Sequence, residues 1–229
     1  RRTSGEYASE RFKRLMIPFI VGTILFSPLG FYLEWLQAVQ NGATTLSFVD
    51  YAMPHFAFTP AMFGYGMHLW FLGFLFSFAI LTLPLLQWFK RDPGQRVIAW
   101  LARFSERRGG ILIFIIPLII VKLVLQPFFP QQNDWADFFY QMVYFTLGFV
   151  LFANERFAQA VRRDWWMIVG AAILAFASLV AMLPFGDPFM WSDTPTLPQF
   201  YLVQSLVVVN GFGWSVFMLF IGMRFLDFT

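Results

Sequence analysis

The chain contains no cysteine and few charged residues. Of its 229 residues, 13% are charged and 59% are hydrophobic, with a mean hydropathy of +0.63. A soluble domain carries about 25% charged residues, so this chain lacks the polar side chains to coat a water-exposed surface. An intrinsically disordered chain would need low hydrophobicity and high charge, so disorder is excluded. The lack of cysteine excludes disulfide scaffolds, cysteine nucleophiles and thiolate metal sites. These absences leave a polytopic membrane protein.

Six apolar stretches approach the length of about 20 residues that a helix needs to cross the hydrocarbon layer. The sequence therefore predicts an all-α polytopic membrane helix bundle with six transmembrane helices. Small residues in Gly170-Ala-Ala and Asn210-Gly-Phe-Gly213 predict close helix packing, and Pro84 and Pro117 predict kinks. The six spans are Leu15 to Gln37, His68 to Phe89, Gly110 to Pro127, Asp137 to Ala153, Trp165 to Pro184 and Phe200 to Phe225.

The basic residues are divided unevenly between the connections. Fifteen of the 16 lysines and arginines lie before the first span, between spans two and three, between spans four and five, or at the end of span six. The alternate connections, Ala38 to Met67, Phe128 to Ala136 and Phe185 to Gln199, hold none. Cytoplasmic loops of membrane proteins are enriched in lysine and arginine. Both ends of the chain are therefore predicted to be cytoplasmic.

The connection over residues 90–109 is basic and amphipathic. Val97, Leu101 and Phe104 recur at helical spacing, while Arg96 and Arg103 lie elsewhere on the helical wheel. This pattern predicts a short cytoplasmic helix on the anionic inner leaflet. A solvated basic loop is the alternative.

Arg11 and Arg14 form the first candidate binding site. They are three residues apart just before the first span, so they would share one face of a helix. Arginine binds phosphate with two parallel hydrogen bonds, which suggests a phosphate-bearing cytoplasmic ligand. A basic cluster that only sets topology is the alternative.

The two histidines of the chain are further candidates. His68 lies at the outer end of the second span and could act as a general base or orient a substrate hydroxyl, because its ordinary pKa is near neutrality. His55 lies in the long outer loop. For both, hydrogen bonding to lipid headgroups or loop carbonyls is the alternative.

Some ionisable residues lie inside the predicted spans, where charge is costly and suggests function. Lys122 and Glu34 both lie near the outer end of their spans, so they are predicted to pair. Asp137 is a rival partner for Lys122, and snorkelling of Lys122 to the interface is another alternative. No metal-binding or phosphate-loop motif is found, and no metal site is expected.

Several motifs carry a family resemblance. Arg11-x-x-Arg14-Leu-x-x-Pro18 opens the first span, and Pro54-His55-Phe56 lies in the outer loop. Gly66-x-His68-Leu-Trp-Phe-Leu72 heads the second span, and Asp134-Trp-Ala-Asp137-Phe and Tyr144-Phe-x-x-Gly148-Phe follow. In this order the motifs resemble the membrane acyltransferase 3 family, in particular its glucan biosynthesis protein C-like subgroup.

The resemblance implies a bacterial inner-membrane enzyme of about ten spans. Such an enzyme moves an acyl group from a cytoplasmic acyl-CoA-type donor to a hydroxyl of a cell-envelope glycan. It implies that Arg11 and Arg14 hold the phosphates of the donor, and that His68 is a catalytic residue near the acceptor. No bound cofactor is expected.

We further expect a substrate path lined by four side chains. The partners expected are the lipid bilayer, acyl-CoA and an envelope polysaccharide or glucan acceptor, without nucleic acid. The four path residues are Glu34, His55, Trp70 and Lys122.

One family feature is missing. The first span of the family carries a basic residue followed eleven positions later by histidine, about three helical turns away. Here Thr44 lies eleven positions before His55, and Ala57 lies eleven before His68. We therefore expect residues 1–229 to form a single transmembrane acyltransferase domain that is truncated at both ends. The main catalytic histidine would lie upstream, and the piece alone would be inactive.

Two other classes of function stay open. A carrier or flippase for an anionic or glycan-linked substrate would use the same arginines, Lys122 and Glu34 along a pathway. Such transporters show inverted repeats with broken midplane helices, which the sequence does not suggest. A binding-only membrane scaffold is the third class.

Overall fold

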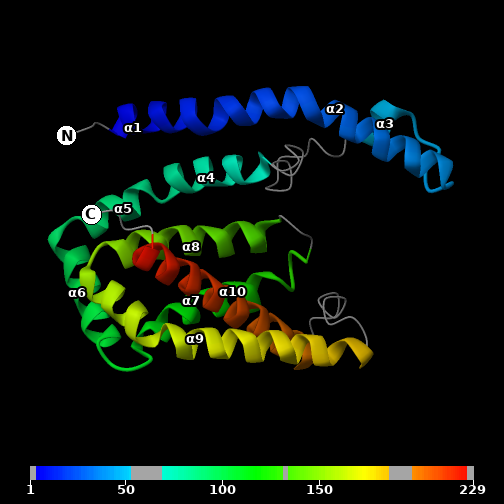
Figure 1. Cartoon of the computed structure of the whole chain (residues 1–229). Helices are drawn as coiled ribbons and strands as arrows, with labels where there is room; N and C mark the ends of the chain where they lie inside the picture. The colour runs from blue at the N-terminus through cyan, green and yellow to red at the C-terminus, as the bar shows by residue number, and fades with distance from the viewer. Residues whose placement is uncertain (1–3, 53–68, 131–133, 186–197, 226–229) are drawn as a thin grey trace. The chain divides into compact units, whose positions relative to one another are not determined.

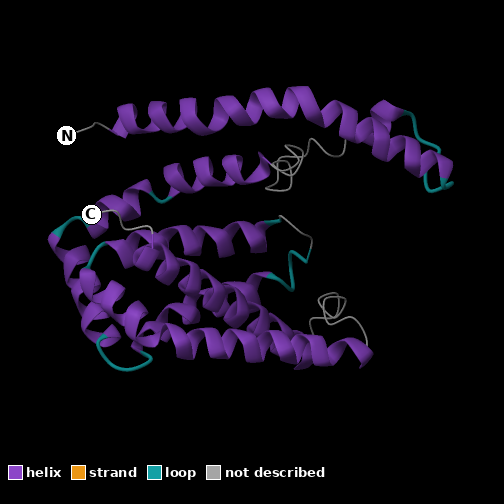
Figure 2. Ribbon diagram, viewed as in Figure 1, coloured by secondary structure: helices purple, strands orange, loops and turns teal. Residues whose placement is uncertain are grey.

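This computed structural model describes residues 4–52, 69–130, 134–185 and 198–225. Within these ranges every regular element is helical (Figure 2), which confirms the all-α prediction. The chain divides into two compact units, which are described separately. Unit 1 comprises residues 1–83 and 131–138, and unit 2 comprises residues 84–130 and 139–229.

Unit 1 begins with a long helical stretch (Figure 1). Helix α1 (Ser4–Arg11) passes into a π-helical turn, η1 (Phe12–Met16), and then into α2 (Ile17–Gln40). The stretch bends by 40° between residues 26 and 28, at Pro28. Proline lacks the backbone N–H of a helix and crowds the preceding turn, which explains this bend, absent from the sequence prediction.

Aromatic rings connect the helices of unit 1. Helix α3 (Phe48–Ala52) packs on α2, and the Trp35 indole donates a hydrogen bond of 3.0 Å to the Leu46 carbonyl. Helix α4 (Trp70–Leu81) packs on α1, η1 and α2. The Phe74 and Phe78 rings meet Phe138 edge to face at 5.2 and 5.0 Å. Such pairs add stabilisation beyond the buried area.

The predicted second span is interrupted. Helix α4 ends at Leu81, and α5 (Leu83–Phe89) begins after Thr82, whose hydroxyl donates 2.6 Å to the Phe78 carbonyl. Pro84 follows directly. A break at Pro84 is therefore confirmed.

Unit 2 contains the other helices. They include α6 (Asp92–Ser105), a 3-10 turn η4 (Gly110–Phe114) and α7 (Ile115–Leu125). The remaining elements are α8 (Trp135–Phe152), whose first residues belong to unit 1, α9 (Glu155–Met182), a short 3-10 turn (Leu183–Phe185) and α10 (Pro198–Phe225). Pro117, a predicted kink, lies in the first turn of α7. The departure from α-helical geometry in this segment is the 3-10 turn η4, which comes before Pro117. The shared core consists mainly of Ile111, Leu118, Phe157, Ile168, Val208 and Phe212.

Helix α6 covers a segment for which the sequence allowed two interpretations, a short helix or a solvated loop. Its buried side consists of Gly94, Ile98, Ala102 and Ser105, which face the interior of the protein. Trp100 is 53% exposed on the other side. The helical interpretation of this segment is correct, and its place on the inner leaflet stays a prediction.

The described residues contain three to five candidate membrane spans, whereas the sequence predicts six. Three helices, α8, α9 and α10, are long and apolar enough to cross a membrane, and the count reaches five if each broken pair is one span. The helix over Gly110–Leu125 is apolar but shorter than 18 residues. Six spans are therefore not confirmed in the described part of the chain.

The contact between α9 and α10 is close because Gly213 lacks a side chain. A Cβ atom at Gly213 would lie 2.4 Å from the Ala172 Cβ and 3.0 Å from the Ile168 carbonyl oxygen. Small residues let membrane helices approach at backbone distance. The prediction of small-residue packing is confirmed at Gly213 and Ala172, whereas Gly170 has open space beside it.

We predict that Gly213→Ala destabilises the protein by about 1–3 kcal/mol, the usual cost of overpacking. Neither the Ala172 methyl group nor the Ile168 backbone can rotate away, so the two helices must separate. The measurement is the melting temperature of the intact chain in detergent. Gly222→Ala on the same helix is the matched control, since nothing lies within 4 Å of that position. Equal melting temperatures for the two variants would contradict this packing.

Candidate functional site

The Arg11–Arg14 motif lies at the π-helical turn of unit 1. Arg11 ends α1, and Arg14 belongs to the turn itself. A π-helical turn closes i→i+5 hydrogen bonds and is frequent at functional sites. The sequence prediction was a regular α-helix here, and the π-helical turn corrects it.

Each arginine of this motif contacts a side chain four residues earlier. The Arg11 guanidinium lies over the Tyr7 ring, 5.2 Å from its centroid. Arg14 Nη2 lies 2.8 Å from Glu10 Oε1, and the Arg14 side chain is 72% exposed. An ion pair this exposed contributes about 0–1 kcal/mol. A phosphate could therefore replace Glu10 at low cost.

The other predicted site residues of unit 1 lie apart from this motif or outside the described residues. Glu34 is exposed on α2. Trp70 begins α4 and contacts the Phe74 ring edge to face at 5.3 Å. His55 and His68 lie outside the described residues, so their proposed roles stay predictions.

Lys122 is buried near the end of α7. The residue is 8% exposed, and its ammonium group donates a hydrogen bond of 2.9 Å to Gln126 Oε1. It also lies 5.1 Å from the centroid of the Tyr140 ring, a cation–π contact that stabilises a desolvated charge. This burial argues against snorkelling to the interface. Pairing with Glu34 or Asp137 stays a prediction.

Hydroxyl groups extend this site from α8 to α10. The Tyr140 and Tyr144 hydroxyls are 3.4 Å apart, and Ser215 lies beside Tyr144. Ser215 donates 2.8 Å to the Gly211 carbonyl. A Cβ at Gly211 would lie 3.4 Å from both tyrosine hydroxyls, so glycine leaves room for them.

We give the name polar row to a set of five residues: Lys122, Gln126, Tyr140, Tyr144 and Ser215. It joins α7, α8 and α10 within a largely apolar bundle, where polar groups are costly and usually functional. Of these five residues, the sequence analysis assigned a site role only to Lys122. The spacing of Tyr140 and Tyr144, four residues apart on one helix face, is a sequence signal for the two tyrosines, but it does not indicate Gln126 or Ser215.

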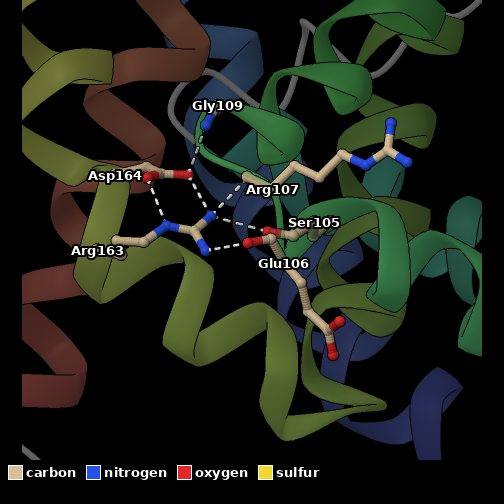
Figure 3. A network of polar contacts seen from close by, with 6 residues as sticks. All are labelled: Ser105, Glu106, Arg107, Gly109, Arg163 and Asp164. Carbon is tan, nitrogen blue, oxygen red and sulfur yellow. Dashed lines mark hydrogen bonds and ion pairs between the residues drawn. The ribbon is translucent and has the colours of Figure 1, made fainter.

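A second polar cluster fixes the turn between α6 and η4 against α9 (Figure 3). The Arg163 guanidinium donates to the Ser105 carbonyl at 2.9 Å, to the Arg107 carbonyl at 2.7 Å, and to the Glu106 carbonyl. The last carbonyls of a helix have no partner within it. Arg163 supplies that partner at the end of α6.

Asp164 completes this cluster from beneath the turn. Its buried carboxylate accepts 3.0 Å from the Gly109 N–H and 2.8 Å from Arg163 Nε. Gly109 has a φ of 72°, a left-handed conformation that favours glycine. The sequence analysis used Arg163 only as evidence of topology and did not predict this cluster.

The described residues hold no group of three or more histidine, cysteine, aspartate or glutamate side chains that could bind a metal ion. Both polar clusters offer hydrogen bonds, and the polar row also carries the positive charge of Lys122. Chemically, such groups can bind anions and orient carbonyl or hydroxyl groups.

The family model described as an acyltransferase domain, that of the acyltransferase 3 family, matches residues 1–226. The chain belongs to the acyltransferase 3 family. No curated protein and no solved structure matches it. With its apolar helices, this acyltransferase 3 domain is a membrane acyltransferase.

We predict that Asp164→Asn lowers the free energy of unfolding by about 1.5–3 kcal/mol, the contribution of hydrogen bonds to a charged group. Asparagine keeps the shape but loses the charge that holds Arg163 and the Gly109 N–H. Chemical denaturation of the intact chain in detergent measures the change. The control is Arg156→Gln, which removes an exposed ion pair of 3.0 Å with Glu106 and should cost about 0–1 kcal/mol. A larger loss in the control than in Asp164→Asn would refute the role of the cluster.

Proposed function

We propose that this membrane acyltransferase moves an acyl group from an acyl-CoA-type donor in the cytoplasm to a hydroxyl of a cell-envelope glycan. The proposal rests on the family match over residues 1–226 and on one structural observation. That observation is the exposed Arg14, held only weakly by Glu10, at a π-helical turn shared with Arg11.

The distribution of basic residues predicts the side of the membrane on which the donor binds. The positive-inside rule assigns the connections that hold fifteen of the 16 basic residues to the cytoplasm, where acyl-CoA would be available. Arg11 and Arg14 would bind its phosphates, with Arg14 exchanging Glu10 for a phosphate oxygen. Planar guanidinium groups suit this role because each can bind phosphate bidentately.

The reaction we propose is attack of a sugar hydroxyl on the thioester carbonyl. The new bond joins the sugar oxygen to the acyl carbon, the carbon–sulfur bond breaks, and CoA leaves as the thiol after taking up the proton of the hydroxyl. A general base must accept that proton first. His68 is proposed to lie near the acceptor and to orient its hydroxyl.

The path between donor and acceptor is proposed to follow polar groups in the bundle. Lys122 is the best supported member, because its ammonium group is buried yet hydrogen-bonded. A buried cation of this kind can stabilise negative charge that develops on a carbonyl oxygen. Glu34, His55 and Trp70 are proposed as further members of the path.

The setting we propose is the bacterial inner membrane, with both ends of this chain in the cytoplasm. Acyl-CoA is consumed as a co-substrate, and an envelope polysaccharide or glucan is the acceptor. A carrier or flippase would instead move its substrate across the membrane without forming an ester.

We predict that Arg14→Ala lowers glycan acylation about 10- to 100-fold, because a charge-assisted hydrogen bond to a phosphate contributes about 1.5–3 kcal/mol. The measurement is ester-linked label on the extracted glycan, in cells that express the intact protein at equal levels. Lys13→Ala is the matched control, since Lys13 is the exposed neighbour in the same turn and should retain activity. Normal acylation in Arg14→Ala would remove the donor-site assignment, and label transported without esterification would favour a carrier.

A further inference from the structure

A hollow lies at the basic end of unit 2, between the start of α9 and the end of α10. It has a volume of 690 Å³, within the usual range of ligand pockets. The described residues that line it are two arginines, three aromatic residues and a methionine, namely Arg162, Arg224, Trp165, Phe220, Phe225 and Met223. No acidic side chain among the described residues lines it.

The two arginines at this hollow are exposed, and their positive charge is available. Arg162 donates one long hydrogen bond, 3.4 Å, to the Met223 carbonyl near the end of α10. Arg224 lies 5.8 Å from the centroid of the Phe225 ring. A guanidinium group has five N–H donors, so each arginine keeps donors for an anion. Among the described residues neither one forms an ion pair.

The rest of the hollow is apolar and aromatic. The Trp165 ring stacks on Phe220 with centroids 4.6 Å apart and planes 9° apart. Phe225 is 66% exposed. This lining suits hydrocarbon chains better than it suits a free hydrophilic anion. The ligand should therefore combine a negative headgroup with apolar chains.

The position of the hollow along α9 indicates that its ligand is a lipid of the membrane. Tryptophan favours the interface between headgroups and hydrocarbon, and Trp165 and Trp166 lie at the start of the apolar part of α9. Arg162 precedes Trp165 by three residues, about 4.5 Å along the axis, on the charged side. When the tryptophans lie at the interface, Arg162 therefore lies at the depth of the lipid phosphate groups.

An exposed apolar stripe continues from Arg162 along α9. Trp166, Ile173, Phe176 and Val180 follow it at spacings near multiples of 3.6 residues, and all four are exposed large hydrophobic residues. Acyl chains of a lipid with its phosphate at Arg162 could lie along this stripe. A neighbouring hollow of 440 Å³ shares Arg162 and Met223 but also includes Glu155, so the headgroup belongs on the Arg224 side.

We propose that the hollow between Arg162 and Arg224 binds one anionic phospholipid of the inner leaflet. The phosphate lies between the two guanidinium groups, and the acyl chains follow the exposed face of α9. Basic pockets between helices on the cytoplasmic side are typical sites for acidic lipid headgroups. This site differs from the proposed donor site at Arg11 and Arg14, and it does not depend on the acyl-transfer proposal.

Native mass spectrometry of the intact chain in detergent tests the site. Phosphatidylglycerol should bind more tightly than phosphatidylcholine with the same acyl chains. Replacing both residues, Arg162→Ala and Arg224→Ala, should weaken phosphatidylglycerol binding about 25-fold, since each arginine near a membrane surface contributes about fivefold. Arg103→Ala is the matched control, because Arg103 is an exposed arginine of α6 that does not line the hollow, and it should leave binding unchanged.

Three results would overturn the proposal. The first is unchanged phosphatidylglycerol binding in the double variant, and the second is equal binding of the two lipids by the unaltered chain. The third is displacement of the lipid by inorganic phosphate or by CoA, which would assign the hollow to a free anion or to the acyl donor.

A photoreactive phosphatidylglycerol provides a readout that needs no variant. In the unaltered chain its label should fall on peptides that contain Trp165, Phe220 or Met223. Labelling only elsewhere would refute the site. Both readouts measure binding, so their outcome is separate from whether the chain acylates a glycan.

Discussion

The close approach of α9 and α10 at Gly213 is the contact on which unit 2 depends. Lipid tails are as apolar as leucine, so membrane helices associate by close packing and polar contacts. The missing side chain of Gly213 lets α10 contact Ala172 directly. Ser215 lies two residues further along α10, whereas Arg163 and Asp164 lie on α9. One polar cluster therefore includes α10, and the other includes α9.

Polar groups are few in this chain, and the structure pairs two buried charged groups with specific partners. The Lys122 ammonium group contacts an amide oxygen and an aromatic ring, and the Asp164 carboxylate contacts a backbone N–H and a guanidinium group. Unsatisfied polar groups would cost several kcal/mol in hydrocarbon. Arg14, Arg162 and Arg224 differ because they are exposed. Together with the partly buried Arg11, these three arginines are the ones that we assign to external phosphates.

Much of the secondary structure could be predicted from apolar length, because a helix that crosses lipid must satisfy its own backbone. The break at Pro84 and the packing at Gly213 also followed from residue type. The π-helical turn at Arg14 did not follow from residue type, whereas Pro28 carried the same signal as Pro84 and its bend was missed. The distant neighbours of Arg163 and Tyr144, the Ser105 carbonyl and Ser215, lie on other helices more than 50 residues away, and no local pattern reports them. The count of six spans is not confirmed in the described residues, because Gly110–Leu125 is short and because two candidate spans are bent or broken.

Our central claim is that the basic connections face the cytoplasm, because this decides on which side of the membrane the donor binds. The chain has no cysteine, so single cysteines can be introduced without background and labelled with a membrane-impermeant maleimide. Lys13→Cys and Arg103→Cys should react only after the membrane is opened. Asn41→Cys, exposed in a connection that holds no basic residue, should react from outside in intact cells. Labelling of Lys13→Cys from outside, or of all three positions from one side, would contradict the account.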